Sequence, residues 1–258
     1  MKHMEQYLNN INRNQDDNRT ELFCNVFEVS SERLKFLLFL GMIDPKYDDD
    51  VLNIKLHKMK QLMFESYIQT ELERLENKYQ SNKIITFELF ILDDHDKFVM
   101  DKLGGVSATT EWSGEMCFIV DTIEQVKPVL KSVIAHEFHH HLRIQRLNIT
   151  EENETLLDRM VMEGMAEHFV KVELGEGYLG PYKDALSAEE IEYWNSKVKS
   201  HLFDKGTTTD AFMFGCQEQK IPFWCGYALG YFLVARYIAT HPGLSIKTLT
   251  ALPSSEFI

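Results

Sequence analysis

Residues 133–143 read VIAHEFHHHLR, and this stretch decides how the rest of the chain is interpreted. It contains the pattern His136-Glu137-x-x-His140. Residues four apart project from one face of a helix, so both imidazoles can bind a single metal ion through bonds of about 2.0–2.1 Å. Glu137 lies on the turn between them, where its carboxylate can reach a water on the metal. The spacing therefore predicts a zinc site with His136 and His140 as ligands and Glu137 as general base.

A solvated cluster is the alternative interpretation, because four of the six residues from His136 to His141 are histidines. The sequence context favours the metal. Apolar residues recur upstream at helical spacing, which predicts that the motif lies on a helix packed in the core; they are Val126, Val129, Leu130, Val133 and Ile134. An unpaired group of imidazoles would be costly in that environment.

A catalytic zinc needs a third protein ligand and one open position. Glu163 and Glu167 are four residues apart on a helical face that is otherwise apolar. We assign Glu163 as the third ligand and Glu167 as the acceptor for the second ring N–H of a ligand histidine. Gly164 would let the two helices approach each other closely.

Three alternatives stay open for this face. The two glutamates could exchange roles, His168 could be the ligand, or both carboxylates could pair with Arg159 and Lys171 on the surface. A different zinc class is excluded. Metzincins continue the motif with x-x-G-x-x-H, whereas those positions here hold Arg143 and Arg146.

Tyr227 and Tyr231 lie one helical turn apart in the stretch PFWCGYALGY, residues 222–231. A zinc peptidase needs a hydrogen-bond donor for the oxyanion that forms when water attacks a carbonyl, and a tyrosine hydroxyl suits this role. In the alternative, both rings pack in the core with their hydroxyls bonded to backbone. The second interpretation is favoured for Tyr231, and for Tyr227 the residue chemistry leaves both open.

The composition is that of an ordinary globular protein. The 258 residues include 40 Asp and Glu against 27 Lys and Arg, for a formal charge of −13. An acidic chain without a basic block is a poor partner for nucleic acid or an anionic membrane. No apolar run is long enough to span a bilayer, and the polar N-terminus lacks a signal-peptide pattern. The four cysteines form no CxxC pair, so we expect reduced, mostly buried thiols and a cytoplasmic protein.

Helices, then a small sheet, then more helices are expected along the chain, which is an α+β order. Residues 1–20 predict a loose start or a first short helix. A helix capped by Ser31 and a long amphipathic helix from Asp48 to about Tyr79 follow. Strands are expected over 84–92, after a turn at 104–108, and over 115–120.

The helices expected after the sheet begin near Pro128, at Glu151 with a stop at Gly175, at the capping box that starts with Ser187, and at Ile221. The predicted organisation is an N-terminal helical region over residues 1–80 and a domain over 81–258. That domain contains the sheet at 84–120 and the helical part at 126–258.

Three pieces of the chain resemble the YjaZ-like predicted zinc-dependent proteases of bacteria. They are HEFHH at 136–140, EGMAEH at 163–168 and PFWCGYALGY at 222–231. The stretch GGVSATTEW at 104–112 looks like the strand before the active helix of that family. The order is also similar to that of gluzincins, in which a glutamate on the next helix is the third ligand. The resemblance spans roughly the C-terminal two-thirds and implies a zincin fold of the gluzincin type with protease activity.

The resemblance bears on single residues as well. In zinc aminopeptidases the ligand is the Glu of an E-G pair, which matches Glu163 followed by Gly164. Their oxyanion tyrosine lies in a Y-x-x-G pattern, which matches Tyr227 and Gly230 and favours Tyr227 as the donor. The aminopeptidase G-x-M-E-N motif is absent, so recognition of a free N-terminus is not implied.

Together these features predict a metallohydrolase that binds one Zn²⁺ per chain and cleaves a peptide or protein. The sheet edge at Gly105, Val106, Ser107 and Ala108 could hold an extended peptide by strand addition. Two other functions stay open: a non-hydrolytic, zinc-binding regulatory or chaperone-like module, and a hydrolase of a non-peptide amide. Glu137 argues against the first, because a purely structural zinc has four protein ligands and needs no base. The sequence does not indicate the oligomeric state.

Overall fold

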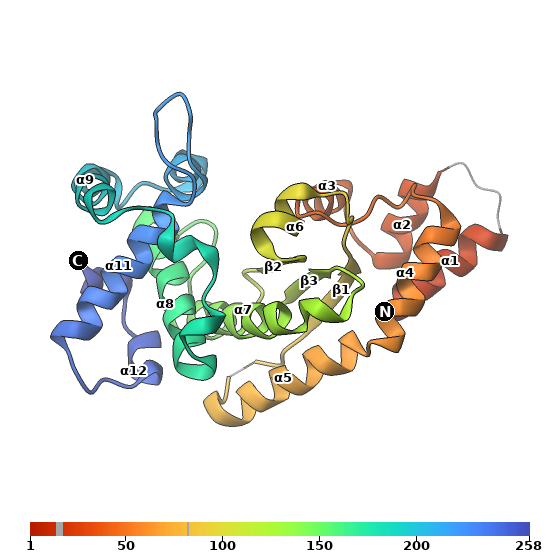
Figure 1. The fold of residues 1–258 in the computed structure, drawn as a ribbon, viewed down its shortest axis with the longest axis horizontal. Coiled ribbons are helices and arrows are strands. Elements are labelled where there is room, and N and C mark those ends of the chain that lie inside the picture. Colours follow the sequence, from red (N-terminus) through yellow and green to blue (C-terminus); the bar gives the residue numbers. More distant parts are fainter. Residues whose placement is uncertain (14–17, 82) are drawn as a thin grey trace.

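Four of the helices before the sheet lie at one end of the molecule (Figure 1). A computed structural model describes residues 1–13, 18–81 and 83–258. Residues 14–17, in the stretch where a loose start or a short helix is expected, lie outside the described residues. The helices at this end are α1 (Lys2–Arg13), α2 (Arg19–Phe27), α3 (Ser31–Phe39) and α4 (Asp49–Gln61). A fifth helix, α5 (Phe64–Tyr79), runs from this end toward the helices that follow the sheet.

The sheet lies in the middle of the molecule and has the strand order β1-β3-β2. Its strands are β1 (Phe87–Ile91), β2 (Val106–Thr110) and β3 (Met116–Val120). β1 runs parallel to β3, and β2 runs antiparallel to it, with Thr110 opposite Met116. All five residues of β3 are buried, as expected for a strand whose sequence is continuously apolar. β2 is an edge strand that also contacts α7, and it begins at Val106, within the segment 104–108 that the sequence predicts as a turn.

A short helix that the sequence analysis does not anticipate, α6 (Lys97–Leu103), connects β1 to β2. Its local signals are nevertheless present. The Asp96 carboxylate accepts the N–H of Val99 at 3.0 Å, and Gly104 ends the helix at φ +66°. Only a glycine adopts that backbone conformation without strain.

Of the helices after the sheet, α7 (Lys127–Leu147) lies along the sheet in the middle of the molecule, and the others lie at the far end (Figure 1). The others are α8 (Leu156–Leu174), α9 (Ala188–Val198), α10 (Asp210–Phe214), α11 (Cys225–Thr240) and α12 (Ile246–Thr250). The predicted α+β class is confirmed. No helix in the described part of the chain is long and apolar enough to cross a membrane.

Capping residues set several helix boundaries. The Ser187–Glu190 capping box and the helix stop at Gly175 are found where they are expected. α8 starts at Leu156 rather than near Glu151, because Thr155 and Asp158 form a capping box of their own.

Two further helix starts differ from the expectation. Ser30, instead of Ser31, caps α3 by accepting the N–H of Arg33 at 3.0 Å. α11 starts at Cys225 instead of Ile221, because Cys216 and Ile221 exchange backbone hydrogen bonds of 3.0 and 2.8 Å and hold the preceding segment as a turn.

The single long helix predicted from Asp48 to Tyr79 is wrong. The chain forms two helices, α4 and α5, which are separated by a bend at Met63 with φ +57°. Met63 is 62% exposed, whereas the next residue, Phe64, is fully buried. Apolar residues keep their helical spacing across the bend, so the periodicity does not reveal it.

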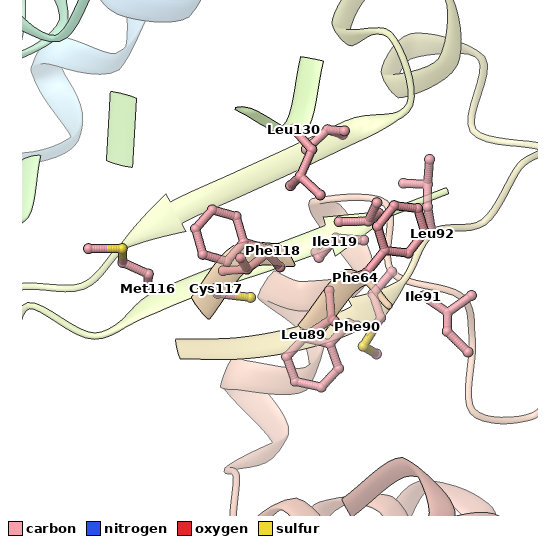
Figure 2. Packing of buried hydrophobic residues seen from close by; sticks show 14 of the residues in the cluster. Phe64, Leu89, Phe90, Ile91, Leu92, Met116, Cys117, Phe118, Ile119 and Leu130 are labelled. Carbon is pink, nitrogen blue, oxygen red and sulfur yellow. The ribbon is translucent and has the colours of Figure 1, made fainter. Parts of the chain in front are cut away.

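One hydrophobic cluster joins the N-terminal helices to the sheet and to α7 (Figure 2). Phe64, Phe90, Phe118 and Leu130 are fully buried members of it. The cluster contains residues on both sides of position 80, the boundary that the sequence analysis expects between two regions. A second cluster comprises residues of α8, α11 and the C-terminal segments. α7 belongs to the first cluster and most of α8 to the second, so the two helices meet where the clusters adjoin.

Gly164 does permit a close approach of two helices, but its partner is α11 and not α7. A Cβ atom on Gly164 would lie 2.2 Å from the carbonyl oxygen of Gly230, and a Cβ on Gly230 would lie 1.8 Å from the carbonyl oxygen of Met160. Both distances are far below any van der Waals contact. The two glycines therefore allow α8 and α11 to cross backbone against backbone.

Candidate metal centre

Three side chains from α7 and α8 converge on one point. The Nε2 atom of His136 lies 3.0 Å from Oε2 of Glu163, and Nε2 of His140 lies 3.6 Å from the same oxygen. The two imidazole rings are 4.6 Å apart between centroids. All three side chains are at least four-fifths buried. Two ring nitrogens and one carboxylate oxygen thus face each other at the junction of the two helices.

The arrangement fits a tetrahedral zinc ion. Ligand atoms bound to zinc at about 2.0–2.1 Å lie about 3.3 Å from one another, between the two distances measured here. The Nδ1 atom of His140 is buried and has no hydrogen-bond partner among the described residues. Donor type, spacing and burial all match the Glu-containing class of catalytic zinc sites, in which three protein ligands leave one position open.

Glu167 connects this centre to the segment that follows α8. Its Oε1 accepts a hydrogen bond from Nδ1–H of His136 at 2.9 Å, and its Oε2 accepts the backbone N–H of Gly180 at 2.7 Å. The bond to Nδ1 orients the ring so that Nε2 faces Glu163, where a metal ion would take the place of the proton between them. Glu167 therefore orients His136, while both of its oxygens are engaged in hydrogen bonds.

The electrostatics of the centre follow from this pairing. Burial alone lowers the pKa of His136, but its hydrogen bonds to Glu163 and Glu167 outweigh burial and hold the pKa well above its usual value. Burial likewise raises the pKa of Glu163, but His140 and His136 together lower it well below the ordinary range. Glu163 is thus an ionised carboxylate, the form that binds a metal.

The other residues considered as partners or ligands on this face of α8 contact different groups in the structure. Arg159 pairs with Asp210 at 2.7 Å, and Lys171 pairs with Glu176 at 2.6 Å. Nε2–H of His168 donates to the backbone carbonyl oxygen of Tyr231 at 3.3 Å, and the imidazole stacks on the Tyr231 ring. These contacts leave Glu163 as the acidic residue of α8 that meets both histidines.

Glu137 makes a contact that the sequence analysis missed. The hydroxyl of Thr110, at the end of edge strand β2, donates to Oε2 of Glu137 at 2.7 Å. A ligand atom of Glu137 also lies within 4.8 Å of those of His136 and His140. The edge strand therefore orients the carboxylate beside the metal position. Thr110 follows the four strand residues singled out from the sequence by only two positions, but a threonine in a strand has no local feature that marks it.

Gly105, Val106, Ser107 and Ala108, which the sequence predicts as a substrate-binding edge, lie at or just before the start of β2, whereas Thr110 lies at its end. Gly105 is fully engaged in backbone hydrogen bonds, since its N–H donates to Val99 and its carbonyl accepts from Asp121, at 3.0 and 2.9 Å. Val106 and Ser107 are buried, and Ala108 is half-buried. Substrate binding at these four residues stays a prediction, and the part of β2 that touches the centre is Thr110.

Tyr227 and Tyr231 have different surroundings. Tyr231 stacks on His168 with ring centroids 4.4 Å apart, away from the three converging side chains. Burial raises the pKa of the Tyr227 phenol well above its usual value, and the carboxylates of Glu163 and Glu137 raise it further, so the phenol stays protonated.

A third phenol, Tyr182, also lies at the centre, and the sequence analysis does not anticipate it. Its ring is 6.1 Å from the ring of His136 and 5.1 Å from that of Tyr227. It lies in a short 3₁₀ turn, Pro181–Asp184, between α8 and α9. Gly-Pro-Tyr is an ordinary turn sequence, so only the tertiary fold reveals this position.

His139 and His141 flank His140 and are fully buried. His139 contacts the hydroxyl of Thr250 at 3.3 Å, and His141 contacts the carbonyl oxygen of Gly114 at 2.7 Å. Burial lowers the pKa of both imidazoles. They are neutral packing residues that point away from the metal position.

The fold and the site together define an α+β protein with a candidate metal centre, in which a glutamate on the next helix faces the two histidines of a His-Glu-x-x-His motif. The chain belongs to the family described as predicted Zn-dependent protease (DUF2268), whose profile matches residues 64–258. The matched range includes every residue of the centre described above.

Two relatives in Bacillus subtilis (strain 168) are similar to parts of the chain. The uncharacterized protein YjaZ is 27% identical over 203 residues, which cover 76% of each chain. The uncharacterized protein YjfC is 29% identical over 140 residues, which cover 51% of this chain and 46% of YjfC. No solved structure matches the chain.

Proposed function

We propose that the protein is a zinc-dependent peptidase with a zincin fold of the gluzincin type. The observation that carries the proposal is the convergence of His136, His140 and Glu163 on one point, while Glu137 is turned toward Thr110. Three ligands with an adjacent, separately oriented carboxylate are typical of a catalytic zinc site. A structural zinc site would use a fourth protein ligand instead.

Each residue has a distinct role in this proposal. His136, His140 and Glu163 hold one zinc ion per chain, and Glu167 orients His136. A bound zinc ion lowers the pKa of its water toward about 7 and polarises the carbonyl that is attacked. Glu137 takes the proton of the attacking water and delivers it to the leaving amine. Tyr227 donates a hydrogen bond to the carbonyl oxygen as negative charge develops on it.

The substrate in this proposal is a peptide or protein that lies along the edge of β2. An extended chain beside an edge strand receives main-chain hydrogen bonds, which favour binding without requiring a particular sequence. Thr110 at the end of this strand contacts Glu137, so a peptide bound there would run past the general base. A non-peptide amide would use the same chemistry without needing the strand.

The test is the conservative variant Glu137→Gln. It should keep zinc at one ion per chain and lower peptide turnover by about 10²–10⁴-fold, because an amide cannot accept the proton. Glu152→Gln, at an exposed position, is the matched control and should retain both zinc and activity. Zinc content and digestion of a broad peptide library are measured for all three proteins.

The outcomes separate the three functions. Full hydrolysis by Glu137→Gln would refute the mechanism. A wild-type protein that holds zinc but cleaves no library peptide would favour the non-hydrolytic module, unless it hydrolyses small acyl amides with the same dependence on Glu137.

A further inference from the structure

We propose that Tyr182 is a second oxyanion donor, so that two phenols, those of Tyr182 and Tyr227, bind the oxygen of the scissile carbonyl. The inference rests on the proposed peptidase activity and concerns a residue outside the family's recognisable motifs. It is carried by three independent features of the structure: the position of the ring, the way in which its segment is held, and the free hydroxyl.

The position of Tyr182 is defined by rings on three sides. Its ring centroid is 6.1 Å from that of His136, 5.1 Å from that of Tyr227, and 5.0 Å from that of Trp224, against which it packs edge to face. Tyr227 and Trp224 belong to the start of α11, whereas Tyr182 comes from the segment after α8. The two phenols thus reach the metal centre side by side from different parts of the chain.

The segment that carries Tyr182 is attached to the centre itself. Glu167 accepts the N–H of Gly180 with one oxygen and binds His136 with the other, at 2.7 and 2.9 Å. A Cβ atom on Gly180 would lie 2.2 Å from Cε2 of Tyr182, so the ring folds back over the glycine. The hydroxyl of Ser132 on α7 holds the same segment by donating to the carbonyl of Tyr178. A ring merely covering the surface would not need these attachments.

The hydroxyl of Tyr182 is available as a donor. Neither it nor the hydroxyl of Tyr227 makes a hydrogen bond to any of the residues that the structure describes. Burial raises the pKa of Tyr182 well above its usual value, and the carboxylates of Glu167, Glu163 and Glu137 raise it further. The phenol therefore stays protonated, and its O–H can donate to an oxyanion that forms at the centre.

Two donors on one oxygen act chiefly when charge develops. A neutral phenol binds a ground-state carbonyl weakly and an oxyanion strongly, so loss of either hydroxyl affects kcat more than KM. Tyr182→Phe removes the hydroxyl and leaves the ring contacts with Trp224 and Tyr227 in place. Tyr178→Phe is the matched control, because it removes a phenol from the same segment without touching the centre.

The experiment uses the full-length protein loaded with zinc and the best peptide from the library digest. Tyr182→Phe should retain one zinc per chain, keep KM within about threefold, and lower kcat at least tenfold, up to the roughly 10²–10³-fold cost of losing one oxyanion donor. Its affinity for a phosphonate analogue of that peptide should fall by the same factor as kcat/KM. Tyr178→Phe should match wild type within twofold in all four measurements.

A second variant moves the ring and keeps the hydroxyl. Gly180 has φ −66°, which alanine adopts readily, but the added methyl group would displace the Tyr182 ring. Gly180→Ala should therefore lose kcat as Tyr182→Phe does and change the fluorescence of Trp224. Gly177→Ala, where a Cβ meets no atom within 4 Å, is its control.

The measurements distinguish failure of this inference from failure of the proposed peptidase activity. If Tyr182→Phe hydrolyses the peptide as well as Tyr178→Phe, the second donor is refuted while the peptidase proposal stands. A loss of zinc, or an equal loss of affinity for peptide and phosphonate, would assign Tyr182 a structural role instead. If the wild-type protein cleaves no peptide, the proposed function fails and this inference fails with it.

Discussion

Gly164 of α8 lies against the backbone of Gly230 of α11 so closely that a methyl group on Gly164 would be 2.2 Å from the Gly230 carbonyl oxygen. Glu163 precedes the first glycine, and Tyr227 lies one helical turn before the second. The crossing therefore sets how near the proposed oxyanion donor comes to the proposed metal ligand. An approach this close needs a glycine on both helices at the same point.

Gly164→Ala should destabilise the protein and weaken the metal site together. The new Cβ meets backbone, which cannot rotate away, so we expect a loss of about 3 kcal/mol or more in unfolding free energy. That corresponds to a fall of roughly 6–12 °C in Tm. Thermal unfolding and zinc content measure the effect, with Gly177→Ala as control. An unchanged Tm for Gly164→Ala would contradict the described crossing.

Substitution of Glu163 should weaken zinc binding far more than substitution of Glu167. Glu163→Gln removes a charged ligand and should cut zinc occupancy sharply, as should His140→Ala. Glu167→Gln should lower zinc affinity by only about 10–100-fold, because it loosens the orientation of His136. Zinc titration against a competing chelator measures all three, with the exposed His57→Ala as control. The reverse ranking would exchange the roles of the two glutamates.

Thr110→Val should impair turnover and spare the metal. Valine keeps the shape and strand preference of threonine but cannot donate to Glu137. We expect kcat to fall about tenfold or more, because the general base is no longer held in place. Thr109→Val, one position earlier on the same strand, is the control. Equal kcat values for the two variants would mean that the hydrogen bond has no part in catalysis.

Glu154→Gln should stabilise the protein only toward alkaline pH. Burial raises the pKa of this carboxyl from 4.5 to about 8, despite the opposing charge of Arg159. Between these values the folded state holds a proton that the unfolded state has released, so stability falls as pH rises from about 4.5 to 8. Glutamine removes that dependence. Its benefit should be absent near pH 4 and full above pH 8.

The size of this effect follows from the linkage. One pKa unit corresponds to about 1.4 kcal/mol, or about 3–5 °C in Tm. We therefore expect Glu154→Gln to raise Tm by at least that amount at pH 8.5. Glu152→Gln, two residues earlier and exposed, should show no pH-dependent gain. A gain that is equal at pH 4 and pH 8.5 would point to packing instead of ionisation.

Features encoded by short stretches of sequence could be predicted. The face shared by His136 and His140 follows from a spacing of four residues on a helix. The ends of helices at Gly175 and Ser187 follow from capping preferences that act within one turn. Local rules of this kind also placed Glu163 and Glu167 on one face, and the fold brings that face to the histidines.

Features that depend on contacts across the chain could not be predicted. Tyr182 and Thr110 come to the centre from a 3₁₀ turn and from an edge strand, and neither has a neighbour in sequence that marks it. Gly164 is expected to face α7 but faces α11, because a glycine indicates close packing of two helices and does not identify the second helix. The bend at Met63 was missed because burial of Phe64 in the distant core overrides a continuous helical pattern.

That bend also marks the start of the region that the family profile matches, which begins at Phe64, directly after Met63. The helices α1–α4 precede this region and contact it where the rings of Phe23 and Phe27 lie 6.3 and 5.2 Å from that of Phe90. A chain shortened to the matched region would expose the Phe90 ring to water. Such a shortened protein would therefore need a polar side chain at position 90 to stay soluble.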